Sequence, residues 1–148
     1  MHIMKKIEFR TSINASKEKV WDTMLSHGTY EEWVGAAFPE STYEGEWEKG
    51  QDIRFFGVDK SGLLATVVEA VPGEKVLLRY KAILLPGGIE DTSEKAQEWI
   101  GASENYYFSE IDGLTTVRIE TEINPEWESM FTESWPKMLT KLKELCER

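Results

Sequence analysis

Residues 102–146 read ASENYYFSEIDGLTTVRIETEINPEWESMFTESWPKMLTKLKELC, and this stretch decides the fold. Two alternating runs, 102–112 and 115–123, flank the dipeptide Asp112-Gly113, which is typical of a tight β-hairpin turn. Apolar residues then recur at the spacing of an amphipathic helix. They are Trp127, Met130, Phe131, Trp135, Met138, Leu139, Leu142 and Leu145. A hairpin that runs directly into such a helix predicts an antiparallel sheet covered by the C-terminal helix.

The predicted C-terminal helix has a defined start and an internal irregularity. Asn124 is expected to cap it, and Pro125 occupies the first helical position, where no backbone N–H is needed. Pro136 removes one backbone hydrogen bond from the helix interior. We therefore expect either a kink at Pro136 or two helical pieces, the second of them capped by Ser134.

Strands separated by short turns are predicted upstream of the hairpin. Turn residues such as Lys49-Gly50 and Pro72-Gly73 punctuate this part of the chain. The strands expected there are 41–48, 51–58, 63–71 and 75–84. Together with the hairpin they form an antiparallel meander of six consecutive strands.

The N-terminal part predicts one more strand and two short helices. Residues 5–13 alternate between apolar and polar side chains, as in a half-buried strand that must pair somewhere along the meander. Asn14 and Ser16 offer cap oxygens for a helix that runs to about His27, and Gly28 is expected to end it. A second helix is expected over 29–35. The elements together predict an α+β fold.

The connection formed by residues 85–101 is too long for a hairpin turn. Long connections in compact domains are commonly functional or mobile. Thr92 or Ser93 is placed to cap a short helix that carries Trp99 and Ile100 on one face. We interpret this segment as a flap between two strands, with a plain surface insertion as the alternative.

The composition indicates a single domain, residues 1–148. A formal charge of −10 disfavours binding to nucleic acid and to anionic membranes as partners. A single cysteine, Cys146, excludes an intrachain disulfide and is expected in the core or at its boundary. No secretory signal pattern and no apolar run of membrane-spanning length are present, so the cytoplasm is the expected location.

The order of elements and several residues resemble the START-like (SRPBCC) superfamily. Its opening is similar to Ile13-Asn14-Ala15-Ser16 followed by Val20-Trp21 and then Trp33. Within the superfamily the chain resembles the group named after the activator of the heat-shock protein 90 ATPase. The stretches that carry this second resemblance are Tyr43-Glu44-Gly45 through Gly50, Thr66 to Glu69 before Pro72, Leu77 to Tyr80, and Ser134-Trp135-Pro136.

The resemblance implies a helix-grip fold, in which a curved antiparallel sheet wraps around a long C-terminal helix and two short helices follow the first strand. It also implies a cavity between the sheet and that helix. It does not imply one activity, because such folds host ligand carriers, cyclases, hydrolases and co-chaperones.

Aromatic residues are the candidates for contact with a ligand. Bulky rings either fill a core or line a cavity, and a buried tyrosine hydroxyl needs a hydrogen-bond partner. The residues expected to converge between the sheet and the last helix are Trp33, Phe38, Phe55, Tyr80, Tyr106, Phe108, Phe131 and Trp135. No spacing of histidine, cysteine or acidic residues predicts a metal site, and no cofactor is expected.

Charged residues within predicted strands are the remaining candidates. Arg54, Arg79, Arg118 and Glu69 each lie in such a strand, and any of them that pointed into a cavity would have to be paired or would have a shifted pKa. Alternation favours the solvent face for Arg54 and Arg118. It leaves Glu69 open, because the strand 63–71 is apolar on both faces. His27 is expected at a helix C-terminus, as a surface residue.

The leading hypothesis is a domain that binds a small apolar ligand between the sheet and the last helix. The first alternative is an enzyme of the same fold that uses a cavity acid or tyrosine, although no catalytic constellation is visible. The second is a co-chaperone or protein-interaction domain. An elongated apolar cavity with one inward charge would favour the enzyme, and a filled core with an exposed apolar patch would favour the interaction domain. We expect a monomer or a weak homodimer.

Overall fold

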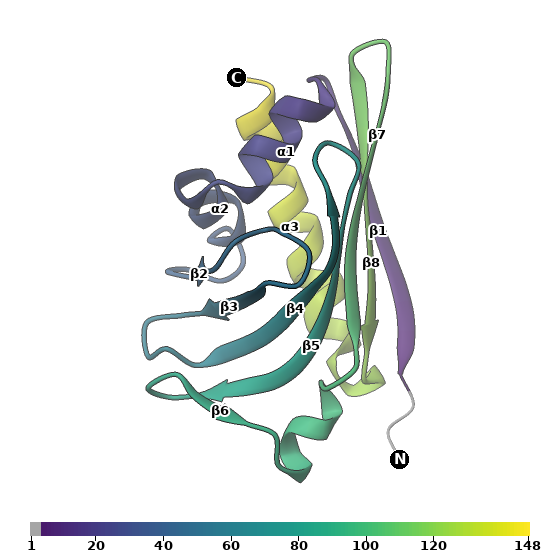
Figure 1. Cartoon of the computed structure of the whole chain (residues 1–148). Coiled ribbons are helices and arrows are strands. Elements are labelled where there is room, and N and C mark those ends of the chain that lie inside the picture. Colours follow the sequence, from purple (N-terminus) through teal and green to yellow (C-terminus); the bar gives the residue numbers. More distant parts are fainter. Residues whose placement is uncertain (1–3) are drawn as a thin grey trace.

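In a computed structural model, which describes residues 4–148, a curved antiparallel sheet wraps around the C-terminal helix (Figure 1). The strands follow the order β1-β8-β7-β5-β4-β3-β2, and β6 pairs with β5 outside this path. Their bounds are β1 (Lys5–Ile13), β2 (Thr42–Glu44), β3 (Asp52–Phe56), β4 (Gly62–Val71), β5 (Lys75–Leu85), β6 (Ile89–Asp91), β7 (Ser103–Ile111) and β8 (Leu114–Ile123). The predicted α+β fold and its helix-grip arrangement are confirmed.

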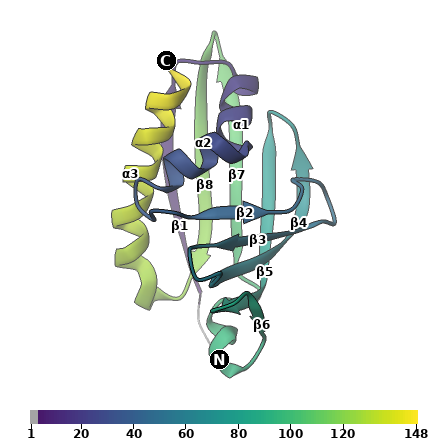
Figure 2. The same ribbon diagram turned by 90° about the vertical axis from the view of Figure 1, so that its left-hand side faces the viewer.

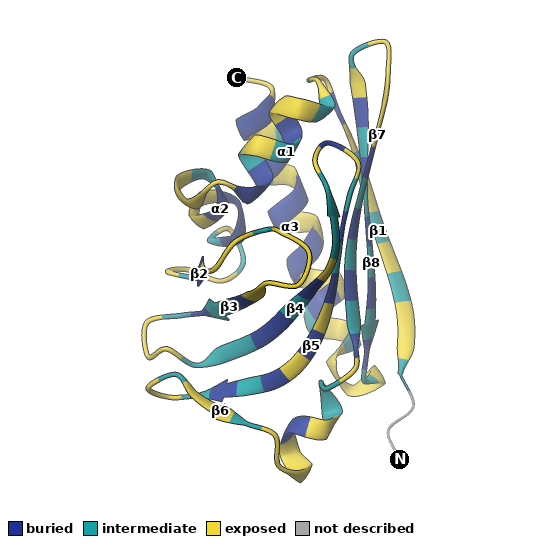
Figure 3. Cartoon of the chain, in the orientation of Figure 1, coloured by how far each residue is buried: buried dark blue, intermediate teal, exposed yellow. Residues whose placement is uncertain are grey.

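The first strand pairs with the last one. β1 runs antiparallel to β8, from Lys5 opposite Ile123 to Ile13 opposite Thr115. Residues 115–123 therefore pair with the hairpin partner β7 on one side and with the start of the chain on the other. Every second residue of β8 is buried, which gives the sheet one apolar face (Figure 3).

Two short helices, α1 (Lys17–Leu25) and α2 (His27–Val34), lie on the same side of the sheet as the long helix (Figure 2). The Ser16 side chain caps α1 by accepting from the backbone N–H of Lys19 at 3.2 Å. The break between the helices is at Ser26, whose backbone is extended, so the predicted break at Gly28 is wrong. Gly28 is the second residue of α2, and the low helix propensity of glycine is only a weak preference.

The predicted position of His27 at a helix C-terminus is also wrong. His27 is the first residue of α2, and its exposed ring stacks on Tyr43 with 4.1 Å between the ring centroids.

The strand predicted over 41–48 is shorter, since β2 ends at Glu44. Gly45 has a φ of +127°, and a Cβ there would lie 2.3 Å from the carbonyl oxygen of Asp52. This left-handed backbone at Gly45 ends the strand.

The C-terminal helix is continuous. A short 3₁₀ turn, η2 (Pro125–Trp127), leads into α3 (Glu128–Cys146), and the Asn124 side chain accepts from the backbone N–H of Glu126 at 3.0 Å. Pro136 lies within α3 without dividing it, so the alternative of two helical pieces is wrong. The Ser134 hydroxyl does not cap a second piece; it donates to the carbonyl oxygen of Met130.

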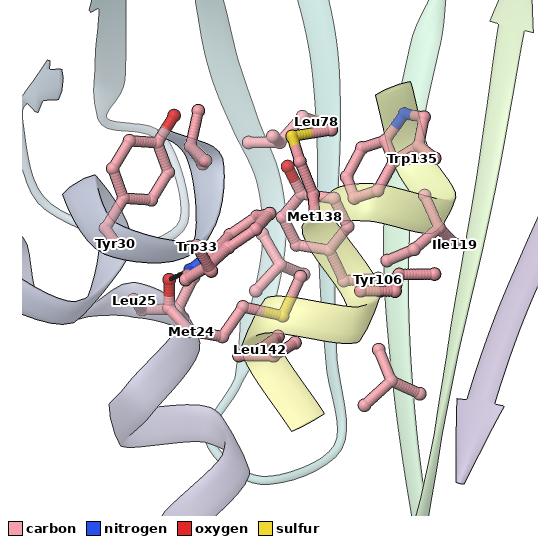
Figure 4. Close-up of a cluster of buried hydrophobic side chains, with 14 of the residues drawn as sticks. Met24, Leu25, Tyr30, Trp33, Leu78, Tyr106, Ile119, Trp135, Met138 and Leu142 are labelled. Atoms are coloured by element: carbon pink, nitrogen blue, oxygen red, sulfur yellow. Dashed lines mark hydrogen bonds between the residues drawn. The ribbon is translucent and has the colours of Figure 1, made fainter. Parts of the chain in front are cut away.

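The core lies between the sheet and the three helices (Figure 4). Trp33 anchors it, because its indole N–H donates to the carbonyl oxygen of Met24 at 2.9 Å and its ring is 1% exposed. Leu142 of α3 and Ile119 of β8 are fully enclosed in the same cluster, and Cys146 is buried at its edge, as predicted. Among the described residues, no helix is long and apolar enough to cross a membrane.

Candidate ligand-binding cavity

A cavity of about 310 Å³ remains between the sheet, α2 and α3. Ten of the residues that line it are aromatic, and rings from the two helices face rings from β3, β5 and β7. Seven of the eight predicted ligand-contacting residues line it: Trp33, Phe38, Phe55, Tyr80, Tyr106, Phe131 and Trp135. Phe38 is 39% exposed and therefore lies at the edge of the cavity.

Phe108 does not line the cavity. Its ring packs edge-on against Trp21 of α1, with 5.4 Å between the centroids, and the residue is buried. Phe108 lies further along β7 than Tyr106, opposite Val117 and toward the β7–β8 turn. Because α1 covers this part of the sheet, Phe108 belongs to the packed core.

Glu104 is the most unusual residue of the cavity. It is 8% exposed, and each of its carboxyl oxygens accepts a hydrogen bond from a buried tyrosine. The Tyr80 hydroxyl donates to Oε1 at 3.1 Å, and the Tyr106 hydroxyl donates to Oε2 at 2.5 Å. Buried acidic side chains are rare in proteins unless they are paired, and here two phenols take the place of a basic partner.

The strand register produces this cluster. Glu104 lies opposite Leu78 of β5, and Tyr106 lies opposite Val76. Tyr80 is two residues beyond Leu78, so its side chain is on the same face and next to Glu104. Its backbone N–H donates to the carbonyl oxygen of Ala102 at 2.9 Å, which keeps β5 and β7 together at this point.

The surroundings shift the pKa values of all three groups upward. Burial raises the pKa of Glu104, and the hydrogen bonds from Tyr106 and Tyr80 only partly oppose this effect. Burial and the negative charge of Glu104 hold the pKa values of Tyr80 and Tyr106 well above their usual range. The two phenols are therefore protonated at neutral pH and remain donors.

The aromatic rings form a connected wall around the carboxyl group. On one side the rings of Tyr80 and Trp99 meet edge-on at 6.3 Å, and Trp99 stacks on Phe131 at 6.3 Å. On the other side the ring centroid of Trp135 lies 6.3 Å from that of Tyr106 and 6.0 Å from that of Trp33. Figure 4 labels these three residues. Such a lining suits a ligand with a flat ring.

Several solved structures share this architecture. The Aha1 dimer from Colwellia psychrerythraea superimposes with a TM-score of 0.73 at 18% identity, over 97% of this chain and 96% of that one. CalU16 from Micromonospora echinospora gives a TM-score of 0.66 at 12% identity, over 96% of this chain and 74% of that one. A protein from Chromobacterium violaceum gives 0.67 at 15% identity, over 97% of both chains.

The chain has the helix-grip fold of these structures. The predicted resemblance is confirmed, since the similar structures include an Aha1, a homologue of the activator of the Hsp90 ATPase. By sequence alone, no family model matches the chain and no curated protein matches it significantly. At these low identities the likeness concerns the fold alone, and the chemistry of the cavity depends on the residues that line it.

The four charged strand residues considered from the sequence lie outside the cavity. Arg54 pairs with Glu90 at 2.7 Å, and Arg118 pairs with Glu120 at 3.0 Å on the outer face, as predicted for both arginines. Arg79 is exposed. Glu69 lies opposite Leu77 of β5. The neighbours of Leu77, Val76 and Leu78, point inward, so Leu77 and Glu69 face outward. Within residues 4–148, no three histidine, cysteine or acidic side chains are grouped to hold a metal ion.

The segment 85–101 is partly built into the sheet. β6 extends the hairpin begun by β5, and a 3₁₀ turn, η1 (Glu94–Glu98), follows with Ser93 at its start. Trp99 then enters the wall of the cavity, whereas Ile100 is not among the lining residues. The segment closes where the backbone N–H of Gly101 donates to the carbonyl oxygen of Tyr80 at 2.9 Å.

Sequence reasoning missed several lining residues. Tyr30, Met130 and Met138 line the cavity from the helices, and Glu104 lines it from β7. A signal for Glu104 was present, because it shares its strand face with Tyr106 and Phe108, both expected to point inward. An acidic residue among the inward-facing residues of a strand indicates a buried polar site.

Proposed function

We propose that this START-like domain binds a small, mainly apolar ligand that contains a ring, in the cavity between the sheet and α3. The observation that carries the proposal is an aromatic-lined space of about 310 Å³ inside a core that is otherwise packed. Protein cores leave few voids larger than a water molecule, and sites for small molecules begin at about 300 Å³. A cavity in place of a filled core also weighs against the interaction-domain alternative.

A second candidate function is catalysis in the same cavity. Glu104 is an inward acid with a raised pKa, and this property favours general acid–base chemistry. Under this alternative Glu104 would exchange a proton with the ligand, and Tyr80 and Tyr106 would orient the carboxyl group. Conversion of a bound compound, abolished by Glu104→Gln without loss of binding, would identify the enzyme.

The association state is a further part of the proposal. The Colwellia structure is that of an Aha1 dimer, whereas for this chain we propose a monomer or a weak homodimer. The net charge of −10 favours mutual repulsion of copies, and it also disfavours nucleic acid as a partner.

Ring-containing apolar compounds are expected to raise the melting temperature in proportion to the logarithm of their concentration. A ligand that binds only the folded state adds about 2.7 kcal/mol of stability at one hundred times its dissociation constant. Differential scanning fluorimetry with a panel of neutral aromatic compounds measures this effect. Native mass spectrometry of the freshly purified protein would show whether a small molecule is already bound.

Two tryptophan substitutions provide the control for this experiment. Leu63→Trp adds a ring to the cavity wall and is expected to abolish the shift, whereas Val68→Trp adds the same ring at a position that is 41% exposed and does not line the cavity. If no compound shifts the melting temperature of the unmodified protein and no bound molecule is found, the proposed function is wrong.

Amides of residues 92–99 are expected to exchange with solvent faster than those of strand 75–84, and a stabilising compound is expected to slow them. Short 3₁₀ turns with few buried residues open at low free energy, and η1 buries only Ala96 among its five residues. Closure over the ligand would protect them, because Trp99 lines the cavity. Hydrogen exchange followed by mass spectrometry measures both rates.

The turn between β7 and β8, residues 111–114, is the internal control for this measurement. It is exposed and does not line the cavity, so its exchange is expected to be the same with and without the compound. Protection of 92–99 equal to that of 75–84, unchanged by the compound, would show that the segment is rigid and does not act as a flap.

A further inference from the structure

The described residues that line the cavity include one acid and no base. Among the lining residues of the described chain, 4–148, Glu104 is the only carboxylate, and no lysine, arginine or histidine is present. The two groups that hydrogen-bond to Glu104, Tyr80 and Tyr106, are neutral donors. A deprotonated Glu104 therefore lacks a positive charge to balance its own.

The carboxyl group retains the capacity to accept from a ligand. A carboxylate has about four lone-pair positions on its two oxygens, and the two tyrosine hydroxyls occupy one on each oxygen. Because Glu104 is among the residues that line the cavity, a donor placed there is within reach of these oxygens. A charged donor would form the stronger bond, since hydrogen bonds between opposite charges are about twice as strong as neutral ones.

The aromatic wall favours the same charge as the carboxylate does. The face of an aromatic ring carries negative potential and attracts a cation, most strongly in tryptophan. Trp99 meets Tyr80, and Trp135 meets Tyr106, so an indole lies beside each phenol that holds Glu104. A cationic group near the carboxylate would be stabilised by both features, whereas an anion would be repelled by both.

We propose that the cavity selects ligands in which a cationic amine is attached to an apolar ring, with the ammonium group paired to Glu104 and the ring held among the tryptophans. This inference rests on the proposed function, since it specifies the ligand of the same cavity. Burial alone raises the pKa of Glu104, and a bound ammonium group would supply the missing counter-charge and favour the carboxylate.

The test uses three probes that share an indole ring: tryptamine, which is cationic at pH 7, tryptophol, which is neutral, and indole-3-acetate, which is anionic. Isothermal titration calorimetry at physiological ionic strength measures their affinities for the unmodified protein. Tryptamine is expected to bind on the order of tenfold more tightly than tryptophol, and indole-3-acetate is expected to bind most weakly.

Two variants separate the role of Glu104 from the general acidity of the protein. Glu104→Gln keeps the shape of the side chain and removes its charge, so the preference for tryptamine over tryptophol is expected to disappear. Glu133→Gln removes the same charge from an exposed position of α3, and the preference is expected to remain. The comparison of probes on the unmodified protein does not require either variant to fold.

Equal affinities of tryptamine and tryptophol for the unmodified protein would overturn the inference, as would a preference that persists in Glu104→Gln. Tryptophol binding in either case would leave the proposed function supported. If none of the three probes binds while members of the neutral aromatic panel do, only the inference fails. If neither set binds, the proposed function fails with it.

Discussion

Replacing Trp135 by alanine is expected to lower the free energy of unfolding by about 3–5 kcal/mol, the usual cost of removing a large buried aromatic side chain. Trp135 is 4% exposed. Its ring is within 6.3 Å, between centroids, of Phe9, Trp33 and Tyr106, so it connects α3 with β1, α2 and β7. Urea denaturation with fluorescence and circular dichroism measures the loss.

Trp127→Ala is the matched control for this experiment. Trp127 precedes α3, is 36% exposed and contacts Trp99 with 5.7 Å between the centroids. Because less of its apolar surface is removed from water, the expected loss is below about 2 kcal/mol. A loss under about 1 kcal/mol for Trp135→Ala would contradict the packing described for α3.

The inward face of α3 illustrates what could be predicted from the sequence. The helical spacing of Phe131, Trp135, Met138 and Leu142 predicted their common face, and all four are buried. This prediction succeeded because the period of a helix is a local property of the chain, and the burial of one face follows from it. The Asp112-Gly113 hairpin succeeded for the same reason, since its turn chemistry is local.

The composition of the site depends on register, which is not local. Tyr80 and Tyr106 were candidates individually, but their meeting at Glu104 requires the pairing of Leu78 with Glu104 across β5 and β7. A shift of that pairing by one residue would turn the side chains of one strand to the other face. No turn joins these two strands directly, because β6 and η1 lie between them, so the register was not set by a hairpin.

Glu69 shows the limit of alternation within a single strand. β4 contains a register irregularity between Val67 and Glu69, and the exposed Val68 lies between them. An extra residue at a bulge reverses the faces of the residues that follow it. The apolar character of both faces of 63–71 therefore did not reveal on which side Glu69 lies. Strand β6 was not predicted, because three residues are too few to show an alternating pattern and they form a strand by pairing with β5.

Relative to the unmodified protein, Glu104→Gln is expected to leave the free energy of unfolding nearly unchanged at pH 4 and to raise it at pH 8. Burial raises the pKa of Glu104 above its usual value of 4.5, so the folded state holds a proton that the unfolded chain has already released. Between these two pKa values the free energy of unfolding of the unmodified protein falls as the pH rises. Tyr80, Tyr106 and the nearby Tyr30 do not titrate in this window, because burial raises their pKa values as well.

The glutamine variant lacks this dependence. Below about pH 4 Glu104 is protonated in both states and the variant gains nothing, since a neutral acid and an amide then form similar hydrogen bonds with the two phenols. As the pH rises above the usual glutamate pKa, the unmodified protein loses stability that the variant keeps. For each tenfold preference of the folded state for the proton, the stability of the variant relative to the unmodified protein rises by about 1.4 kcal/mol between pH 4 and pH 8.

Urea denaturation at pH 4 and at pH 8 measures this difference, with Glu133→Gln as the control for loss of an exposed acidic charge. The control is expected to stay within about 0.5 kcal/mol of the unmodified protein at both pH values, because exposed charges contribute little. A constant difference between Glu104→Gln and the unmodified protein at the two pH values would mean that Glu104 ionises as easily in the folded state as in the unfolded chain. In that case the two phenols alone would compensate fully for its burial, and no counter-charge from a ligand would be needed.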